Sequence, residues 1–337
     1  MKKILPILKG VLLATLFVLS NAGCNDELNL VEGSKDIPVI YGFLSLNDTA
    51  TYIRVEKAFI DPVRGAAEIA KIADSLYYKN ISVTLIRVSN NEKFTLQRVD
   101  GNTEGYVRDA GIFATLPNIL YKIKNANLQM KADEAFRIEI QRTGETKLLA
   151  KATTRVIGAY NIFAPPPTVA LFLTYENTLS ISIETEEKTA KFYDIKVIVN
   201  FDEVSGTTRT PRRAEWLLAG GQPRKGTDVQ TFFRRNARDF YVFLGTTLTP
   251  NPSFAREFKS IDFEVTAAGQ ELVDFQSVGV ANIGITGSQA IPTYTNIEGG
   301  LGIFTSRSKA VLKGIKLNDQ ALEILKTGEL TRNLGFR

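Results

Sequence analysis

Residues 193–201 read YDIKVIVNF and give the plainest indication of fold class in the chain. Apolar side chains occupy every second position, so an extended strand would place them on one face and the polar side chains on the other. The same period of two recurs in apolar residues elsewhere, namely Phe136, Ile138, Ile140, Leu179, Ile181 and Ile183. Short alternating segments separated by turn residues are typical of antiparallel sheets. The sequence therefore predicts a mainly β chain.

Two β-sandwich domains of the immunoglobulin-like type are expected on either side of a proline-rich linker. Residues 161–168 contain three consecutive prolines, a composition that favours a stiff, extended spacer. We therefore expect the first sandwich over 37–160 and a second β-rich domain over 169–337.

A few short helices should interrupt the strands, because some segments show apolar spacings of three and four residues. In the first domain this spacing marks a helical insertion near 66–78. In the second domain it predicts helices over 228–240, with Asp228 as the N-cap, over 270–275 and over 320–326.

Residues 1–23 have the parts of a lipoprotein signal peptide. Two lysines open the segment, residues 12–19 form an apolar core, and small residues precede Cys24. In such a signal the cysteine is alkylated by a diacylglycerol group and becomes the first residue of the mature chain. We therefore expect Cys24 to hold the protein at the outer membrane through its acyl chains. Asn21 stands where a leucine is usual, so secretory cleavage that leaves a free thiol is the alternative.

Residues 24–36 should form a flexible tether, and its acidic start resembles an export signal. Asn25, Asp26 and Glu27 directly follow Cys24. The cluster is similar to the one with which Bacteroidota send lipoproteins to the outer surface of the cell. The resemblance implies a surface-exposed outer-membrane lipoprotein. A periplasm-facing anchor is the alternative, in which the acidic residues only keep the tether polar and hydrated.

Composition excludes several classes of function. The 337 residues carry a formal charge of +5, and removal of residues 1–23 takes away three lysines and no acid, which leaves 38 basic against 36 acidic residues, or +2. A near-neutral chain gives no electrostatic case for binding nucleic acid. Histidine is absent and Cys24 is the single cysteine, so the commonest general base and zinc ligand are missing. We therefore expect a protein that is not an enzyme and needs no cofactor or metal.

A basic window over 209–238 is the most functional-looking polar feature, and it contains the only tryptophan. Arginine side chains suit carboxylates, phosphates and anionic glycans, and an indole ring adds a stacking surface. The candidate contacts for an anion or glycan are Arg212, Arg213, Trp216, Arg234 and Arg235. Local pairing of the arginines with acids such as Glu215 and Asp239 is the competing interpretation.

Two short motifs suggest covalent chemistry. The run Asp48-Thr49-Ala50 resembles the sites that Bacteroidota O-glycosylate in exported proteins, which makes Thr49 a candidate. Ser306 and Lys309 match the Ser-x-x-Lys nucleophile pair of penicillin-binding proteins. That chemistry needs both residues at the start of a helix, whereas this segment has the pattern of a strand.

Three longer segments resemble a family of Bacteroidota outer-membrane lipoproteins of unknown function. They are residues 38–59 (PVIYGFLSLNDTATYIRVEKAF), 73–78 (ADSLYY) and 294–307 (YTNIEGGLGIFTSR). In layout the family is similar to lipoproteins encoded beside TonB-dependent receptors. The resemblance implies location and class, and it transfers no catalytic residue.

The expected function is therefore binding or scaffolding at the outer membrane, with a TonB-dependent receptor or another envelope protein as partner. A glycan-binding or adhesive surface module that uses Trp216 and the basic window is the alternative. A hydrolase that relies on carboxylates alone is a third hypothesis.

Overall fold

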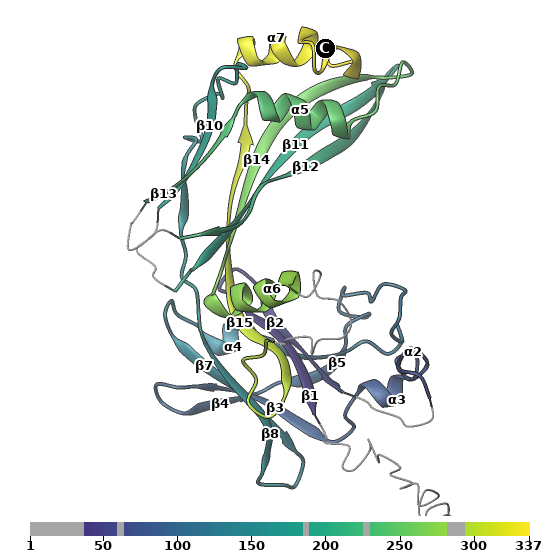
Figure 1. The fold of residues 1–337 in the computed structure, drawn as a ribbon, viewed down its shortest axis with the longest axis vertical. Helices are drawn as coiled ribbons and strands as arrows, with labels where there is room; N and C mark the ends of the chain where they lie inside the picture. Colours follow the sequence, from purple (N-terminus) through teal and green to yellow (C-terminus); the bar gives the residue numbers. More distant parts are fainter. Residues whose placement is uncertain (1–36, 59–63, 185–188, 225–229, 282–293) are drawn as a thin grey trace, which may run out of the picture.

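The computed structural model describes residues 37–58, 64–184, 189–224, 230–281 and 294–337. Strands dominate the described chain, which confirms the prediction of a mainly β protein. The molecule is elongated, with a lower lobe built from the N-terminal strands and an upper lobe that carries the C-terminus (Figure 1). None of the described helices is both long and apolar enough to span a membrane.

An eight-stranded sheet runs through both lobes, and its neighbouring strands are, in order, β12 (Thr208–Pro223), β11 (Phe192–Ser205), β14 (Ala255–Ala268), β15 (Leu301–Ile315), β1 (Pro38–Leu44), β2 (Ala50–Lys57), β6 (Ile119–Lys124) and β5 (Gln97–Asp100). The alternating stretch 193–201 lies in β11, where its apolar side chains face the core of the upper lobe.

In the lower lobe a second sheet packs on the part of the large sheet formed by β1, β2, β6 and β5. Its four strands are, in order, β4 (Glu92–Thr95), β3 (Ile81–Arg87), β7 (Ala135–Arg142) and β8 (Leu148–Arg155). Val83 and Ile138 from this sheet meet Ile53 and Phe304 from the large sheet, and all four side chains are fully buried. Short helical segments lie beside these strands, namely α2 (Ala66–Ile69), α3 (Ala73–Leu76) and α4 (Asn125–Leu128).

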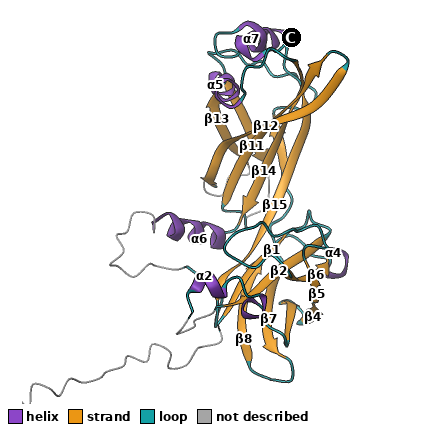
Figure 2. Ribbon diagram, turned by 90° about the vertical axis from the view of Figure 1, so that its right-hand side faces the viewer, coloured by secondary structure: helices purple, strands orange, loops and turns teal. Residues whose placement is uncertain are grey.

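In the upper lobe a three-stranded sheet packs on the other half of the large sheet. Its strands are, in order, β13 (Gln230–Asn236), β10 (Thr178–Glu184) and β9 (Asn161–Ala164). Two helices close the upper end, α5 (Arg238–Thr247) and α7 (Asp319–Thr327), while α6 (Gln270–Ala281) lies at the junction of the lobes and projects to one side (Figure 2). Ile181, Tyr193, Val197 and Phe240 are fully buried in this core.

Strand β15 joins the lobes. Residues 301–306 pair in parallel with β1, and residues 307–315 pair antiparallel with β14 on the other side. One continuous sheet therefore contributes to both hydrophobic cores, and the division into two separate domains stays a prediction. Residues 161–164 of the predicted linker form β9 and pair with β10.

The helices agree with the predictions in three places and disagree in one. The insertion near 66–78 contains α2 and α3, and the later predicted helices lie within α6 and α7. The prediction of a helix over 228–240 is wrong for residues 230–236, which form β13 and pair antiparallel with β10, whereas its last residues, 238–240, begin α5. The two adjacent phenylalanines explain the difference, since Phe233 is buried while Phe232 is 53% exposed, as a strand places neighbours on opposite faces. Asp228 lies outside the described residues.

Candidate binding surfaces at the lobe junction

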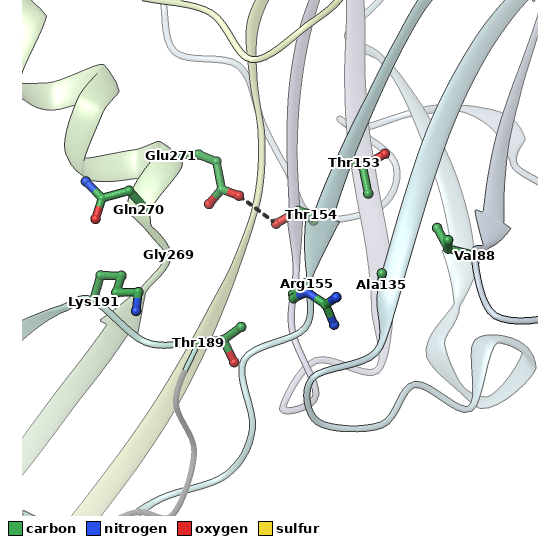
Figure 3. Close-up of a pocket in the computed structure, with 10 residues that line it drawn as sticks. All are labelled: Val88, Ala135, Thr153, Thr154, Arg155, Thr189, Lys191, Gly269, Gln270 and Glu271. Atoms are coloured by element: carbon green, nitrogen blue, oxygen red, sulfur yellow. Dashed lines mark hydrogen bonds between the residues drawn. The ribbon is translucent and has the colours of Figure 1, made fainter. Parts of the chain in front are cut away.

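A cleft of about 580 Å³ lies between the lobes, beside the first turn of α6. Edge strand β8 of the lower lobe supplies Thr153, Thr154 and Arg155 to one wall. Lys191 and the start of α6 supply the facing wall (Figure 3). The cleft is therefore built from both lobes, and its lining combines hydroxyls with charges of both signs.

Glu271 connects the parts that form this cleft. One of its carboxylate oxygens accepts a hydrogen bond from the Thr305 hydroxyl of β15 at 3.0 Å. The other accepts a longer hydrogen bond from the Thr154 hydroxyl of β8 at 3.4 Å (Figure 3). Glu271 stands in the first turn of α6, where a carboxylate complements the partial positive charge of the helix N-terminus. Helix, lower-lobe edge strand and connecting strand thus meet at one side chain.

Gly269 provides the space for this carboxylate at the turn from β14 into α6. A Cβ at Gly269 would lie 2.6 Å from a Glu271 carboxylate oxygen and 3.2 Å from the Thr305 hydroxyl oxygen. Both distances are shorter than ordinary van der Waals contacts. Any other residue at this position would therefore displace the hydrogen-bonded pair.

Two charged side chains of the cleft, Arg155 and Glu271, have partners within the protein. The Arg155 guanidinium donates to the Asp133 carboxylate at 3.3 Å and to the Asp133 carbonyl at 2.9 Å, and both side chains are largely exposed. The Glu271 carboxylate is already engaged by two hydroxyls. This arrangement suits the binding of a polar ligand or polypeptide segment through hydroxyls and surface charges.

A smaller groove of about 160 Å³ lies between α6 and one face of the large sheet. Its apolar walls are Phe43, Phe192, Leu272 and Val273, and Asp194 and Arg307 also line it. The Asp194 carboxylate accepts from the Gly221 amide at 2.7 Å, and Arg307 pairs with Asp48 at 3.3 Å. The groove therefore combines apolar walls with charges that have partners within the protein.

The five candidate contacts of the basic window lie on β12 and β13, and most of them have local partners. Arg212 pairs with Glu203 at 2.9 Å, Arg213 with Glu215 at 3.3 Å, and the Arg235 guanidinium donates to the Leu218 carbonyl at 3.1 Å. Trp216 stacks on Phe243 of α5 with the ring centroids 5.6 Å apart. Arg234 stacks over the exposed Phe232 ring at 5.6 Å. Local pairing describes these contacts, and a ligand-binding role for the window stays a prediction.

The two short motifs that suggest covalent chemistry, at Thr49 and at Ser306 and Lys309, lie in different surroundings. Thr49 lies exposed at the bend between β1 and β2, so its hydroxyl is accessible for modification. Ser306 and Lys309 lie on strand β15 and not at a helix start, and Lys309 pairs with Glu264 at 2.6 Å. A nucleophile pair of the Ser-x-x-Lys type is therefore not formed. Cys24 and the acidic cluster Asn25, Asp26 and Glu27 lie outside the described residues.

Sequence patterns did not indicate the cleft. Thr154 and Glu271 are separated by 117 residues, so only the tertiary fold brings them together. The one local signal is a glycine followed two residues later by a glutamate at the start of a predicted helix, which marks the helix entry but not its partners. In the part of the chain that the structure describes, no group of three or more acidic or cysteine side chains is placed to hold a metal ion.

No family model and no curated protein matches the chain. Solved structures with some similarity include the chicken interferon gamma receptor alpha chain, with 6% identity, coverage of 70% of this chain and 90% of that chain, and a TM-score of 0.18. The C-terminal globular domain of an oligosaccharyltransferase from Pyrococcus abyssi has 9% identity, coverage of 84% and 46%, and a TM-score of 0.21. CBD12 from CALX1.2 has 10% identity, coverage of 83% and 99%, and a TM-score of 0.17. With TM-scores this low, none of these similarities supports a functional conclusion.

Proposed function

We propose that this chain is a lipid-anchored, non-catalytic protein of the outer membrane that binds a partner and holds it there. The observation that carries the proposal is Cys24, which follows a signal-peptide pattern and precedes Asn25 and the acidic residues Asp26 and Glu27. Acyl chains contribute about 0.8 kcal/mol of membrane affinity per buried methylene, and stable anchoring takes more than one chain. A diacylglycerol on Cys24 meets that requirement. The expected partner is a TonB-dependent receptor or another envelope protein.

The cleft between the lobes supports the binding role. Its threonine hydroxyls and its mixed charges, Arg155, Lys191 and Glu271, suit the polar backbone and side chains of a partner segment. Because both lobes line the cleft, a bound segment would also fix the geometry of the junction. A surface-exposed orientation of the protein is proposed from residues 25–27, of which Asp26 and Glu27 are acidic.

The anchor is tested by membrane fractionation of cells that express Cys24→Ala. We expect the variant to leave the membrane fraction, because the acylated thiol is lost. Asn21→Leu is the matched control, since it restores the usual leucine and should keep the protein in the membrane. If Cys24→Ala stays in the membrane fraction, the anchoring proposal fails. Protease treatment of intact cells then decides whether the protein faces outward or toward the periplasm.

The partner is tested by photo-crosslinking in the native membrane. A photoreactive residue at Thr153, which is exposed in the cleft, should capture a TonB-dependent receptor that mass spectrometry identifies. The same residue at Ser205, exposed at the far end of the upper lobe, should not. Equal capture from both positions, or no receptor from either, would argue against the cleft as the partner site.

A glycan-binding module is the second candidate, and one hollow in the upper lobe favours it. This hollow of about 390 Å³ is lined by the exposed Phe232, by Arg234 and by the amide side chains of Gln222 and Gln230. An exposed ring beside amide and guanidinium donors suits a sugar. Binding on a glycan array that Phe232→Ala abolishes and Trp216→Ala leaves intact would support this function, and a blank array would remove it.

A further inference from the structure

The loop between β5 and β6 presents an unusual density of exposed apolar side chains. Within residues 101–118, the exposed fractions are 52% for Tyr106, 73% for Val107, 64% for Ile112, 42% for Phe113 and 70% for Leu116. Single exposed apolar residues are normal on a protein surface, whereas a cluster marks an interaction site. The loop leaves the lower lobe on the side that carries α2 and α3 (Figure 1).

Two asparagines, the buried Asn118 and the half-buried Asn102, hold the backbone of this loop. The Asn118 side-chain amide donates to the Tyr106 carbonyl at 2.7 Å, and the Asn102 amide donates to the Thr115 carbonyl at 3.0 Å. The Asn102 side-chain oxygen accepts from the Arg108 amide at 3.1 Å. The two asparagine side chains thus fix the loop backbone, while the five apolar side chains are exposed. Such preorganisation lowers the entropic cost of binding.

Arg108 fixes the loop beside the place where the described chain begins. Its guanidinium donates to Glu56 at 2.8 Å and to the Tyr77 hydroxyl at 2.9 Å, and it stacks over Phe113 at 4.9 Å. Glu56 lies opposite Val39, the second residue of β1, in the antiparallel register of β1 and β2. The apolar loop is therefore one strand away from the start of β1, to which the tether connects.

The tether limits how far this loop can be from the bilayer. Fourteen residues, 24–37, separate the start of β1 from the membrane if Cys24 is acylated. At full extension they span at most about 50 Å, and a flexible chain of this length averages about 20 Å between its ends. A surface so close to an anchor meets the bilayer at high effective concentration.

We propose that loop 101–118 is a second, non-covalent membrane contact that places its apolar side chains at the acyl boundary of a lipid bilayer, and this rests on the proposed lipid anchor. Tyrosine is enriched at membrane interfaces, and phenylalanine and leucine are among the side chains that interfacial segments bury at the acyl boundary. The charged residues of the loop are Glu104, Arg108 and Asp109, so its net charge is −1. The contact is therefore hydrophobic, and it should need no anionic lipid and tolerate high salt.

The test attaches the mature chain to the bilayer without relying on natural acylation. A histidine tag in place of Cys24 binds a nickel-chelating lipid in phosphatidylcholine vesicles that contain brominated phosphatidylcholine. The bromine atoms lie on the acyl chains and quench tryptophan fluorescence only at short range. Quenching therefore reports a tryptophan that lies within the bilayer. A single tryptophan is placed by Ile112→Trp, or as a control by Val169→Trp, in a Trp216→Phe background. Val169 is 55% exposed and lies outside the loop, between strands β9 and β10 of the upper lobe.

We expect strong quenching at position 112, little at 169, and no change between low and high salt. Adding Val107→Asp and Leu116→Asp to the Ile112→Trp chain should lower quenching to the level of the control, and circular dichroism verifies that the fold is kept. Quenching at 112 that does not exceed quenching at 169 overturns the proposal. If, in addition, the aspartate pair weakens receptor cross-linking in cells, the loop docks a protein instead. Failure of the anchor itself shows separately in the Cys24→Ala fractionation.

Discussion

The Ser306 hydroxyl donates a hydrogen bond to the Leu44 carbonyl over 3.0 Å, although 262 residues separate the two along the chain. The same hydroxyl accepts from the Ile157 amide at 2.9 Å. These contacts join the end of β1, the midpoint of β15 and the segment that leaves the lower lobe for the upper one. Ser306 is 1% exposed, so its role is to hold the junction together.

Replacing this side chain should weaken the junction measurably. Ser306→Ala leaves a buried amide and a buried carbonyl without their side-chain partner, and each such loss costs about 1–3 kcal/mol. We expect the free energy of unfolding in urea to fall by at least about 1 kcal/mol. Ser205→Ala, at an exposed strand end, is the control and should change it by less than about 0.5 kcal/mol. Equal effects of the two variants would show that the hydroxyl contributes nothing.

Arg256 fastens the C-terminal segment to the upper lobe. It is 3% exposed, and its guanidinium donates to the Leu334 carbonyl at 2.6 Å, to the Thr249 carbonyl at 3.0 Å and to Glu203 at 3.3 Å. Arg256→Met should lower the free energy of unfolding by about 3 kcal/mol, near the lower limit for a broken buried pair because Glu203 keeps Arg212 as a partner.

Arg256→Met should also expose the C-terminus to carboxypeptidase, because the hydrogen bond from Arg256 to the Leu334 carbonyl is lost. Arg332→Met, at an exposed position nearby, serves as the control for both measurements. Resistance to carboxypeptidase in Arg256→Met, equal to that of the natural chain, would contradict the fastening role.

Acid stability should depend on Glu257 at the far end of the upper lobe. Hydrogen bonds from Arg209 and then Arg337 lower the pKa of Glu257 from its ordinary value of 4.5 to about 2. A lowered pKa means that the ionised form favours the folded state, so this stabilisation is present above pH 4.5 and is lost as the pH falls toward 2. Urea midpoints should therefore fall less steeply over that range in Glu257→Gln.

The two arginines that pair with Glu257 are largely exposed, so salt can be used to check that these ion pairs cause the effect. Surface ion pairs are screened by salt, so about 1 M NaCl should reduce the difference between Glu257→Gln and the natural chain. Glu323→Gln, at an exposed position of α7, should leave the pH profile unchanged. A profile of Glu257→Gln that matches the natural chain at low salt would rule out this carboxylate as the source of acid sensitivity.

The sequence predicts local structure well where one physical signal dominates. The alternation in 193–201 identifies β11, because a half-buried strand requires that period. It does not reveal that β15 divides its pairing between β1 and β14, since strand partners depend on contacts over hundreds of residues. The cleft around Glu271 was missed for the same reason. The helix predicted over 228–240 shows the opposite limit. Its adjacent apolar residues fit the spacing of a helix or of a strand, and pairing with the neighbouring strand β10 makes residues 230–236 a strand.

Gly302 should be the most sensitive backbone position in β15. Its φ of +101° is unfavourable for other residues, and an added Cβ would lie 2.0 Å from the Ile40 carbonyl oxygen of β1. Gly314, in the same strand, has a φ of +79° but nothing within 4 Å of an added Cβ, so it isolates the backbone effect. Gly314→Ala should cost about 1–2 kcal/mol of unfolding free energy.

Gly302→Ala carries that strain together with a clash against the backbone of β1, so we expect a loss of more than about 4 kcal/mol or failure to fold at 37 °C. Urea denaturation at reduced temperature compares the two variants, and the yield of soluble protein reports a folding failure. Similar costs for both substitutions would mean that β1 can move away from β15 without penalty. A larger cost at Gly302 than at Gly314 would show that the parallel pairing of β15 with β1 leaves no room for a side chain at this position.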